Sequence, residues 1–174
     1  MPDRAATASA QWCRERPDID PLPMEILGRL AEAAQMIARD HLNPLFARFG
    51  LHPGEFDVLA TLRRSGAPYA LMPTALYEAA MISSGGMTNR IDRLEKAGLI
   101  ERRKHPTDRR GTLVGLTGKG HSLIEGLVGP HVENEKAILS ALTPAEQVDL
   151  NRLLEKLIAP FPGRPAHRPN GDAP

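Results

Sequence analysis

A chain of 174 residues with a formal charge of +1 is long enough for one domain of ordinary size, and too nearly neutral to coat nucleic acid without discrimination. Its single cysteine, Cys13, excludes an internal disulfide framework and a thiolate zinc cage. No apolar run approaches a membrane span and the first residues lack the apolar core of a secretory signal, so we expect a cytoplasmic protein with no membrane partner.

The two ends of the chain lack the pattern of a packed core. Residues 1–10 are small and polar, and we expect them to be disordered. They belong to an N-terminal extension, residues 1–22, that contains the one tryptophan of the chain, Trp12. Proline recurs through residues 161–174, which predicts a disordered tail without a helix.

Helical periodicity fills most of the chain between these ends. Apolar residues three and four apart predict a long amphipathic helix over residues 24–49, with a kink or break at Pro44. A second helix is expected from about residue 53 to 65, where Gly66 ends it. A short helix over residues 74–80 follows, with Thr74 as its cap.

The next segment predicts a helix and a hairpin. Ser83 or Ser84 is expected to cap a helix whose inward stripe is Met87, Ile91 and Leu94 and which stops at Gly98. Two short strands, residues 99–103 and 111–116, follow and flank the basic residues 104–110. This pattern favours a β-hairpin with a positively charged tip.

Two further helices complete the chain. Thr117 is expected to cap a helix that runs to about residue 140 and bends at Gly129-Pro130. Thr143 and Glu146 form a capping box with Pro144 at the first helical position, so the last helix starts there. Apolar stripes near both ends of the chain exceed what one small core can cover, which favours a homodimer.

The order of short helix, tight connection, capped helix and basic hairpin is typical of a DNA reader, so double-stranded DNA is the expected partner. Asn89 is the best candidate for reading an adenine edge, and Asp108 could hold a neighbouring arginine extended toward a narrow minor groove. The predicted DNA-binding residues are Ser83, Ser84, Gly86, Thr88, Asn89, Arg93, Arg103, Lys104, Arg109 and Arg110.

Other classes of function are weighed against this one. The six histidines lack metal-ligand spacing and no nucleophile motif has an identifiable base, so we expect no enzyme, no catalytic residue, no metal and no cofactor. Two alternatives stay open. One is a thiol-based redox-sensing regulator that uses Cys13, beside Arg14 and Arg16, and the other is a winged-helix module that binds protein and not DNA.

Two segments, SSGGMTNRIDRLEKAGLIERR (83–103) and PTDRRGTLVGLTGKG (106–120), resemble the recognition helix and wing of MarR-family regulators. The resemblance implies a mainly α fold, in which a winged helix-turn-helix (53–117) with a two-stranded β-wing is embedded in a helical dimerisation scaffold (24–49 and 118–159). The family domain would span residues 23–160. The resemblance further implies a dimer that binds a pseudopalindromic operator, often as a repressor, with Arg110 in the minor groove.

The segments QWCRERPDIDPLPMEILGRL (11–30) and GEFDVLATLRRSGAPY (54–69) resemble the urate-responsive branch of that family. This resemblance implies a ligand pocket made of Trp12, Asp57, Arg90 and Arg102. A planar purine anion such as urate would suit a tryptophan face and an arginine fork. Because Arg90 lies in the expected recognition helix, such a small anionic effector would oppose DNA binding.

Overall fold

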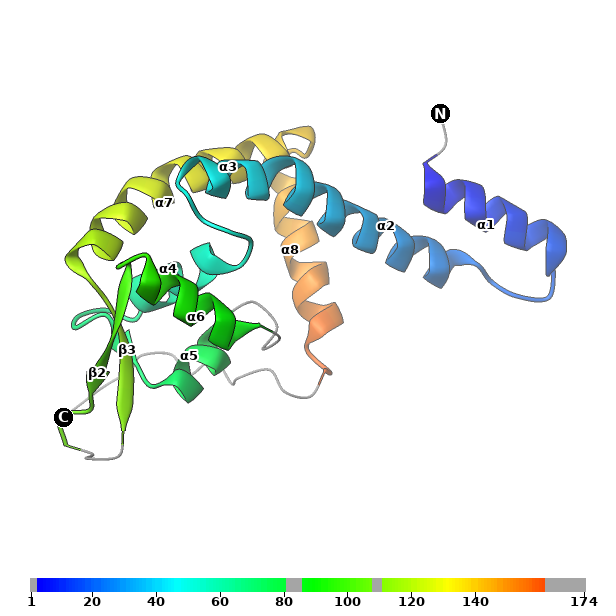
Figure 1. Ribbon diagram of the computed structural model, residues 1–174. Coiled ribbons are helices and arrows are strands. Elements are labelled where there is room, and N and C mark those ends of the chain that lie inside the picture. The colour runs from blue at the N-terminus through cyan, green and yellow to red at the C-terminus, as the bar shows by residue number, and fades with distance from the viewer. Residues whose placement is uncertain (1–2, 81–85, 108–110, 162–174) are drawn as a thin grey trace. The chain divides into compact units, whose positions relative to one another are not determined.

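The computed structural model describes residues 3–80, 86–107 and 111–161, and the chain divides into two compact units, residues 1–45 and 46–174. We name them the N-terminal unit and the C-terminal unit. Both are built mainly from helices, and the C-terminal unit also holds one small sheet (Figure 1). The predicted disordered tail, residues 161–174, lies outside the described residues except for Phe161.

The N-terminal unit begins with a helix where disorder was predicted. Helix α1 (Arg4–Glu15) is followed by α2 (Leu22–Met36), so the prediction for residues 1–10 is wrong. Alanine is the best helix former and supplies four residues of α1, and Asp3 caps the helix by accepting a hydrogen bond from the Ala6 N–H at 2.7 Å. Arg29 of α2 donates to the same carboxylate at 2.8 Å, which lowers the pKa of Asp3 and ties the two helices together.

The predicted helix over residues 24–49 is present as three successive pieces. After α2 the chain widens into a π-helix, η1 (Ile37–Leu42), and then continues as α3 (Asn43–Arg48). The Asn43 N–H bonds to the Ala38 carbonyl five residues earlier. The irregularity lies just before Pro44, because proline has no N–H and its ring crowds the preceding turn, so the helix adjusts there.

The C-terminal unit holds α4 (Glu55–Arg64), α5 (Pro73–Ala79), α6 (Met87–Lys96), α7 (Gly118–Ile138), a short 3₁₀ helix η2 (Leu139–Ala141) and α8 (Pro144–Ile158). Helices α4 to α7 and the sheet enclose the core. The predicted inward stripe of α6 is confirmed, since all three side chains are buried. The most deeply buried apolar side chains are Val58, Leu59, Leu62, Leu76, Met87, Ile91, Leu94, Ile100, Val114, Ile124 and Leu127.

The sheet contains the predicted hairpin and one more strand. Strands β2 (Ile100–Lys104) and β3 (Thr112–Leu116) pair antiparallel, and a two-residue strand β1 (Ala70–Leu71) pairs with the other edge of β3. The sheet is therefore three-stranded, with β3 in the centre. The alternation of a two-residue strand is too short to be recognised in a sequence, which explains why β1 was not predicted.

Local caps fix the ends of these helices. Gly98 ends α6 as predicted: its N–H bonds to the Glu95 carbonyl, and the Leu99 N–H bonds to the Leu94 carbonyl, both at 2.9 Å. Thr117 caps α7, and the capping box at the start of α8 is present. Thr74 does not cap α5, because Pro73, pre-organised for the first helical position, starts the helix after Met72.

The start of α6 also differs from the prediction. The N-cap position of α6 is taken by Gly86, which has no side chain to bond the first turn. The expected cap residues, Ser83 and Ser84, lie outside the described residues. The prediction that a serine occupies the N-cap is therefore wrong, because the helix begins at Met87.

Two helices bury none of their residues and expose apolar stripes, α2 in the N-terminal unit and α8 in the C-terminal unit. The exposed large apolar side chains are Leu22, Met24, Ile26, Leu27, Leu30 and Met36 on α2, and Val148, Leu150, Leu153, Leu157 and Ile158 on α8. Among the described helices, none combines the length and the hydropathy that a membrane crossing requires.

Candidate nucleic-acid interface

Helix α6 presents a polar face beside α5. Its buried stripe faces the core, while Thr88 and Asn89 are exposed in its first turn. The Tyr77 hydroxyl of α5 lies 3.3 Å from the Thr88 hydroxyl and links the two helices. Figure 1 shows α5 and α6 close to each other in the C-terminal unit. The structure thus brings together α5 and α6, the two helices that the sequence predicted before the hairpin, and adds Tyr77 as a contact between them.

The β2–β3 hairpin carries the basic residues. Arg103 and Lys104 are exposed on β2, which runs outward to the hairpin tip (Figure 1). Arg103 donates through Nη2 to the Leu116 carbonyl at 3.0 Å and through Nε to Glu101 at 2.7 Å, so its side chain is held along the sheet. The remaining predicted wing residues, Asp108, Arg109 and Arg110, lie outside the described residues.

Arg102 joins the hairpin to α6. Its Nη2 donates to Asp92 at 2.5 Å, its Nη1 pairs with Glu95, and its backbone N–H donates to Glu95 at 3.2 Å. The hydrogen bond that it donates to Asp92 raises the pKa of the Arg102 guanidinium. The hairpin and α6 are therefore connected by ion pairs of Arg102 with two carboxylates. The sequence did not reveal these pairs, because Asp92 and Glu95 look like ordinary solvent-facing acids of a helix.

A second ionic contact joins α6 to the start of α4. Arg93 donates through Nε to Glu55 at 2.7 Å, and the other Glu55 oxygen accepts the His52 N–H at 2.6 Å. The Glu55 side chain is only 3% exposed, whereas that of Arg93 is 48% exposed. Sequence analysis missed Glu55, because an acid in the first turn of a helix is explained by the helix dipole alone and only the tertiary structure shows that it is buried.

Arg90 lies one turn before Arg93 on α6, and its guanidinium covers Gly54. Gly54 has φ of +81°, which favours glycine, and a Cβ there would lie 2.6 Å from the Arg90 Nε, so a larger residue would displace the Arg90 side chain. Asp57 is half-buried in the first turn of α4. Two of the predicted ligand residues, Asp57 and Arg90, thus belong to the junction between α4 and α6.

The other two predicted ligand residues lie elsewhere. Arg102 is held by Asp92 and Glu95, which are about 200° and 140° around α6 from Arg90 at ~100° per residue, so the two arginines use different sides of that helix. Trp12 belongs to the N-terminal unit. The structure therefore does not gather the four residues into one described pocket, and their shared ligand site stays a prediction.

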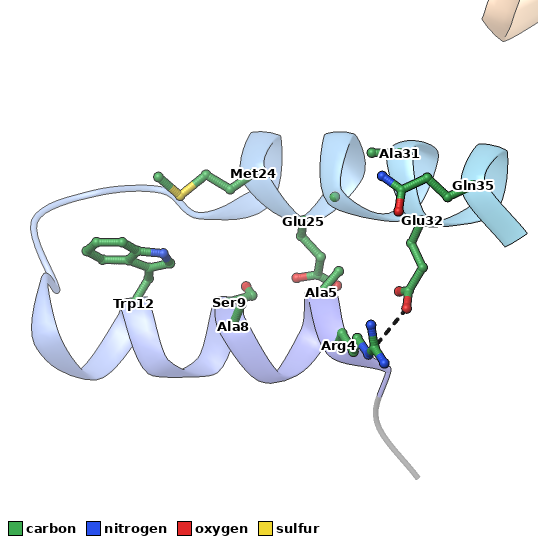
Figure 2. A pocket seen from close by; sticks show the side chains of 11 residues that line it. Arg4, Ala5, Ala8, Ser9, Trp12, Met24, Glu25, Ala31, Glu32 and Gln35 are labelled. Carbon is green, nitrogen blue, oxygen red and sulfur yellow. Dashed lines mark ion pairs between the residues drawn. The ribbon is translucent and has the colours of Figure 1, made fainter.

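Trp12 lines a cleft of about 350 Å³ between α1 and α2. Figure 2 shows its indole facing Met24 near the connecting loop, while Arg4 and Glu32 form an ion pair of 3.6 Å toward the other end. The neighbouring Cys13 is exposed on α1. An aromatic face at the mouth of a cleft can stack on a flat ligand, which keeps the tryptophan available for the predicted role.

Comparisons with known proteins give a consistent result. The model of the MarR family matches residues 51–112. The chain is 44% identical over 147 residues to the HTH-type transcriptional regulator PecS of Dickeya dadantii (strain 3937), with 84% of this chain and 88% of that protein covered.

Solved structures agree with this match. Sco3205, a MarR family transcriptional regulator from Streptomyces coelicolor solved in complex with DNA, has a TM-score of 0.70 and 25% identity, with coverage of 81% of this chain and 87% of that one. Bordetella bronchiseptica BpsR, whose DNA binding is regulated by 6-hydroxynicotinic acid, has a TM-score of 0.63 and 28% identity, with coverage of 76% and 98%. The predicted winged-helix fold class is confirmed, and these relatives are regulators, not enzymes.

Proposed function

This chain belongs to the MarR family of transcriptional regulators, and we propose that it is a homodimeric repressor that leaves a pseudopalindromic operator when a small aromatic anion such as urate binds. The observation that carries the proposal is the ionic contact of Arg102 with Asp92 and Glu95. This contact links α6, on which Asn89 is exposed, to the basic hairpin, and we call the two together the reading surface. Acting on DNA, the protein would work in the cytoplasm.

The reading surface would contact both the major and the minor groove of the DNA. The exposed first turn of α6 suits the major groove, where Asn89 can pair with an adenine edge and Thr88 can reach a phosphate. The hairpin, with Arg103 and Lys104 along β2 and the predicted tip residues beyond them, suits the adjacent backbone and minor groove. Non-specific attraction comes from the wing, and selectivity comes from α6.

A second copy of the chain would cover the exposed apolar stripe of α8. Leu150, Leu153, Leu157 and Ile158 are half-exposed on one side of α8, which is a costly surface for a lone protomer, because full burial of an exposed side chain of this size contributes about 1.5–3 kcal/mol and these would gain part of it. A two-fold dimer would place two copies of α6 about one DNA turn apart, roughly 34 Å, and would explain why the operator is pseudopalindromic.

The effector would act where α4 meets α6 and where the wing is braced. An anion that engages Arg102 competes with Asp92 and Glu95, and an anion that engages Arg90 disturbs the junction with Gly54. Trp12 and Asp57 would complete the pocket. The regulation of BpsR by 6-hydroxynicotinic acid, a flat aromatic acid, supports this chemical class of effector, and urate has the same flat anionic character.

The test is fluorescence anisotropy of a labelled duplex from the DNA upstream of the protein's own gene, with a scrambled duplex as comparison and salt held fixed. We expect tight binding to the first duplex, release by urate, and no release by hypoxanthine, an uncharged purine. Binding that urate does not reverse would refute urate as the effector but not the binding to an operator. Equal binding to both duplexes would refute the proposal that the protein is a sequence-specific regulator.

A direct binding measurement complements the release assay. The chain contains one tryptophan, so urate that stacks on Trp12 should quench the intrinsic fluorescence of the whole protein. The Trp12→Phe variant, read through anisotropy, should need more urate for release from the same duplex. Unchanged fluorescence in the parent after correction for urate absorbance would exclude Trp12 from the pocket.

A further inference from the structure

Glu55 is the one charged residue that is buried among residues 3–80, 86–107 and 111–161. A buried carboxylate is stable only when it is paired and hydrogen-bonded, and Glu55 meets both conditions through Arg93 and the His52 N–H. The segment just before α4 supplies the second partner, the His52 N–H, whereas the first, Arg93, comes from α6. The charge of Glu55 is therefore satisfied only while α6 holds one particular position against α4.

Arg93 is the exposed partner of this buried carboxylate. Its Nε is directed inward to Glu55, although its side chain is 48% exposed and was predicted to bind DNA. Arg90, one turn earlier, covers Gly54 next to Glu55, so two arginines of α6 contact the residues at the start of α4. Met87, Ile91 and Leu94 pack the neighbouring side of α6 against the core, but apolar side chains permit small rotations that a directed ion pair does not.

We propose that Glu55 is a positioning residue for sequence reading: it fixes Arg93, and through it the rotation of α6, so that Asn89 meets its base. Arg93 then acts as an internal brace and not as a phosphate ligand. This inference rests on the proposed operator binding. Loss of the pair would turn α6 and spoil base contacts, while the wing would keep its attraction for any phosphate backbone.

The experiment compares Glu55→Gln, Arg93→Gln and the double variant, with Glu133→Gln as control. Glu133 lies on α7 and pairs with the exposed Lys136, so its replacement removes an acid without touching α6. Anisotropy is measured on the upstream duplex and on its scrambled version, each over a range of salt concentrations, and circular dichroism checks that every variant is folded.

Both single variants should bind the upstream duplex about tenfold more weakly, as expected for the loss of one good base contact, and the scrambled duplex as the parent does. The slope of log Kobs against log salt should not change, because no phosphate contact is lost; a lost contact would lower it by about 0.9. The double variant should be no weaker than either single, since two facing amides can bond each other and leave no unpaired charge.

Three results would overturn the inference: Glu55→Gln behaving like Glu133→Gln, equal weakening on both duplexes, or a salt slope that falls by about 1.8 in Arg93→Gln, which is about 0.9 for each protomer of the dimer. If Glu55→Gln does not fold, the test uses Arg93→Gln, which should fold because the Arg93 side chain is half-exposed. Its salt slope and the ratio of its affinities for the upstream and scrambled duplexes then decide. If the parent does not prefer the upstream duplex, the proposed function and this inference are refuted together. If the parent prefers it and Glu55→Gln binds both duplexes as the parent does, this inference alone is refuted.

Discussion

A Cβ on Gly120 would lie 1.9 Å from the carbonyl oxygen of Leu99, which also accepts the Thr117 N–H at 3.1 Å. The first turn of α7 therefore approaches the residue that precedes β2 so closely that no larger residue fits. The contact joins α7 to the base of the wing. It is a backbone contact and cannot be relieved by a side-chain rotation.

Gly120→Ala should lower the free energy of unfolding by about 3 kcal/mol, because overpacking against a backbone atom forces the chain to move. Gly126→Ala is the matched control: it lies in the same helix with no atom within 4 Å of a new Cβ, so it should stabilise by about 0.5–1 kcal/mol. Urea denaturation of both variants measures the difference. Equal effects of the two substitutions would contradict the close approach.

Glu146 gives a prediction for pH. Its carboxylate accepts the Thr143 N–H and hydroxyl, both at 2.8 Å, and the first of these bonds lowers its pKa most. A carboxyl whose pKa is lower in the folded state stabilises above its unfolded pKa, and this contribution disappears as pH falls through the folded value. The stabilisation by Glu146 is therefore present at neutral pH and lost in acid.

Glu146→Ala should consequently lower Tm at pH 7, and the gap to the parent should close as the pH drops below about 4. Thermal melts between pH 7 and pH 3 follow this gap. Glu133→Ala serves as comparison, because that carboxylate pairs with Lys136 on the exposed surface. A gap for Glu146→Ala that stays constant over the whole range would show that the capping box has no electrostatic component.

At the scale of elements, α6 and the wing are expected to contribute differently to DNA binding. Lys104→Gln at the outer end of β2 should weaken binding to operator and scrambled duplexes alike and lower the salt slope by about 1.8, because each protomer of the dimer loses one phosphate contact worth about 0.9. Lys136→Gln on α7 removes the same charge elsewhere and should leave the slope unchanged. Similar slopes for the two variants would argue against a wing that touches the backbone.

Asn89→Ala should show the complementary pattern. The operator affinity is expected to fall by roughly 30-fold or more, because one base contact of about 1–3 kcal/mol is lost in each half-site, with little change in the salt slope. A panel of duplexes with single base changes should lose discrimination at one position in each half-site. Uniform weakening over the panel would mean that Asn89 contacts phosphate and not a base.

At the scale of the whole molecule, the exposed stripe of α8 predicts the assembly. Leu153→Glu places a charge in the expected interface and should raise the dimer dissociation constant by roughly 10- to 100-fold, with a parallel loss of operator affinity. Arg152→Glu adds the same residue about half a turn of helix from Leu150, on the side where Arg152 pairs with Asp149. Sedimentation over a dilution series distinguishes the two, and identical behaviour would exclude α8 from the interface.

The sequence by itself determined what depends on neighbouring residues. The capping box at Thr143, the stop at Gly98, the inward stripe of α6 and the basic hairpin are local patterns, since each is complete within a few residues. Their order along the chain was enough to predict a helix-turn-helix with a basic hairpin, and the resemblance of residues 83–103 and 106–120 to MarR-family regulators supplied the family. The start of the chain was predicted wrongly: its alanines favour a helix and Asp3 caps α1 locally, and the pair of Asp3 with Arg29 of α2 adds a distant partner.

Only the tertiary structure decided which charges are exposed and which are used internally. Arg93 and Arg102 look like DNA or ligand contacts in the sequence, yet each is held by carboxylates, Arg93 by a residue 38 positions away and Arg102 by residues 7 and 10 positions away. The physical reason is that the cost of burying a charge such as Glu55 depends on its partner, and the partner is chosen by the packing of α4 against α6 and not by the neighbouring sequence.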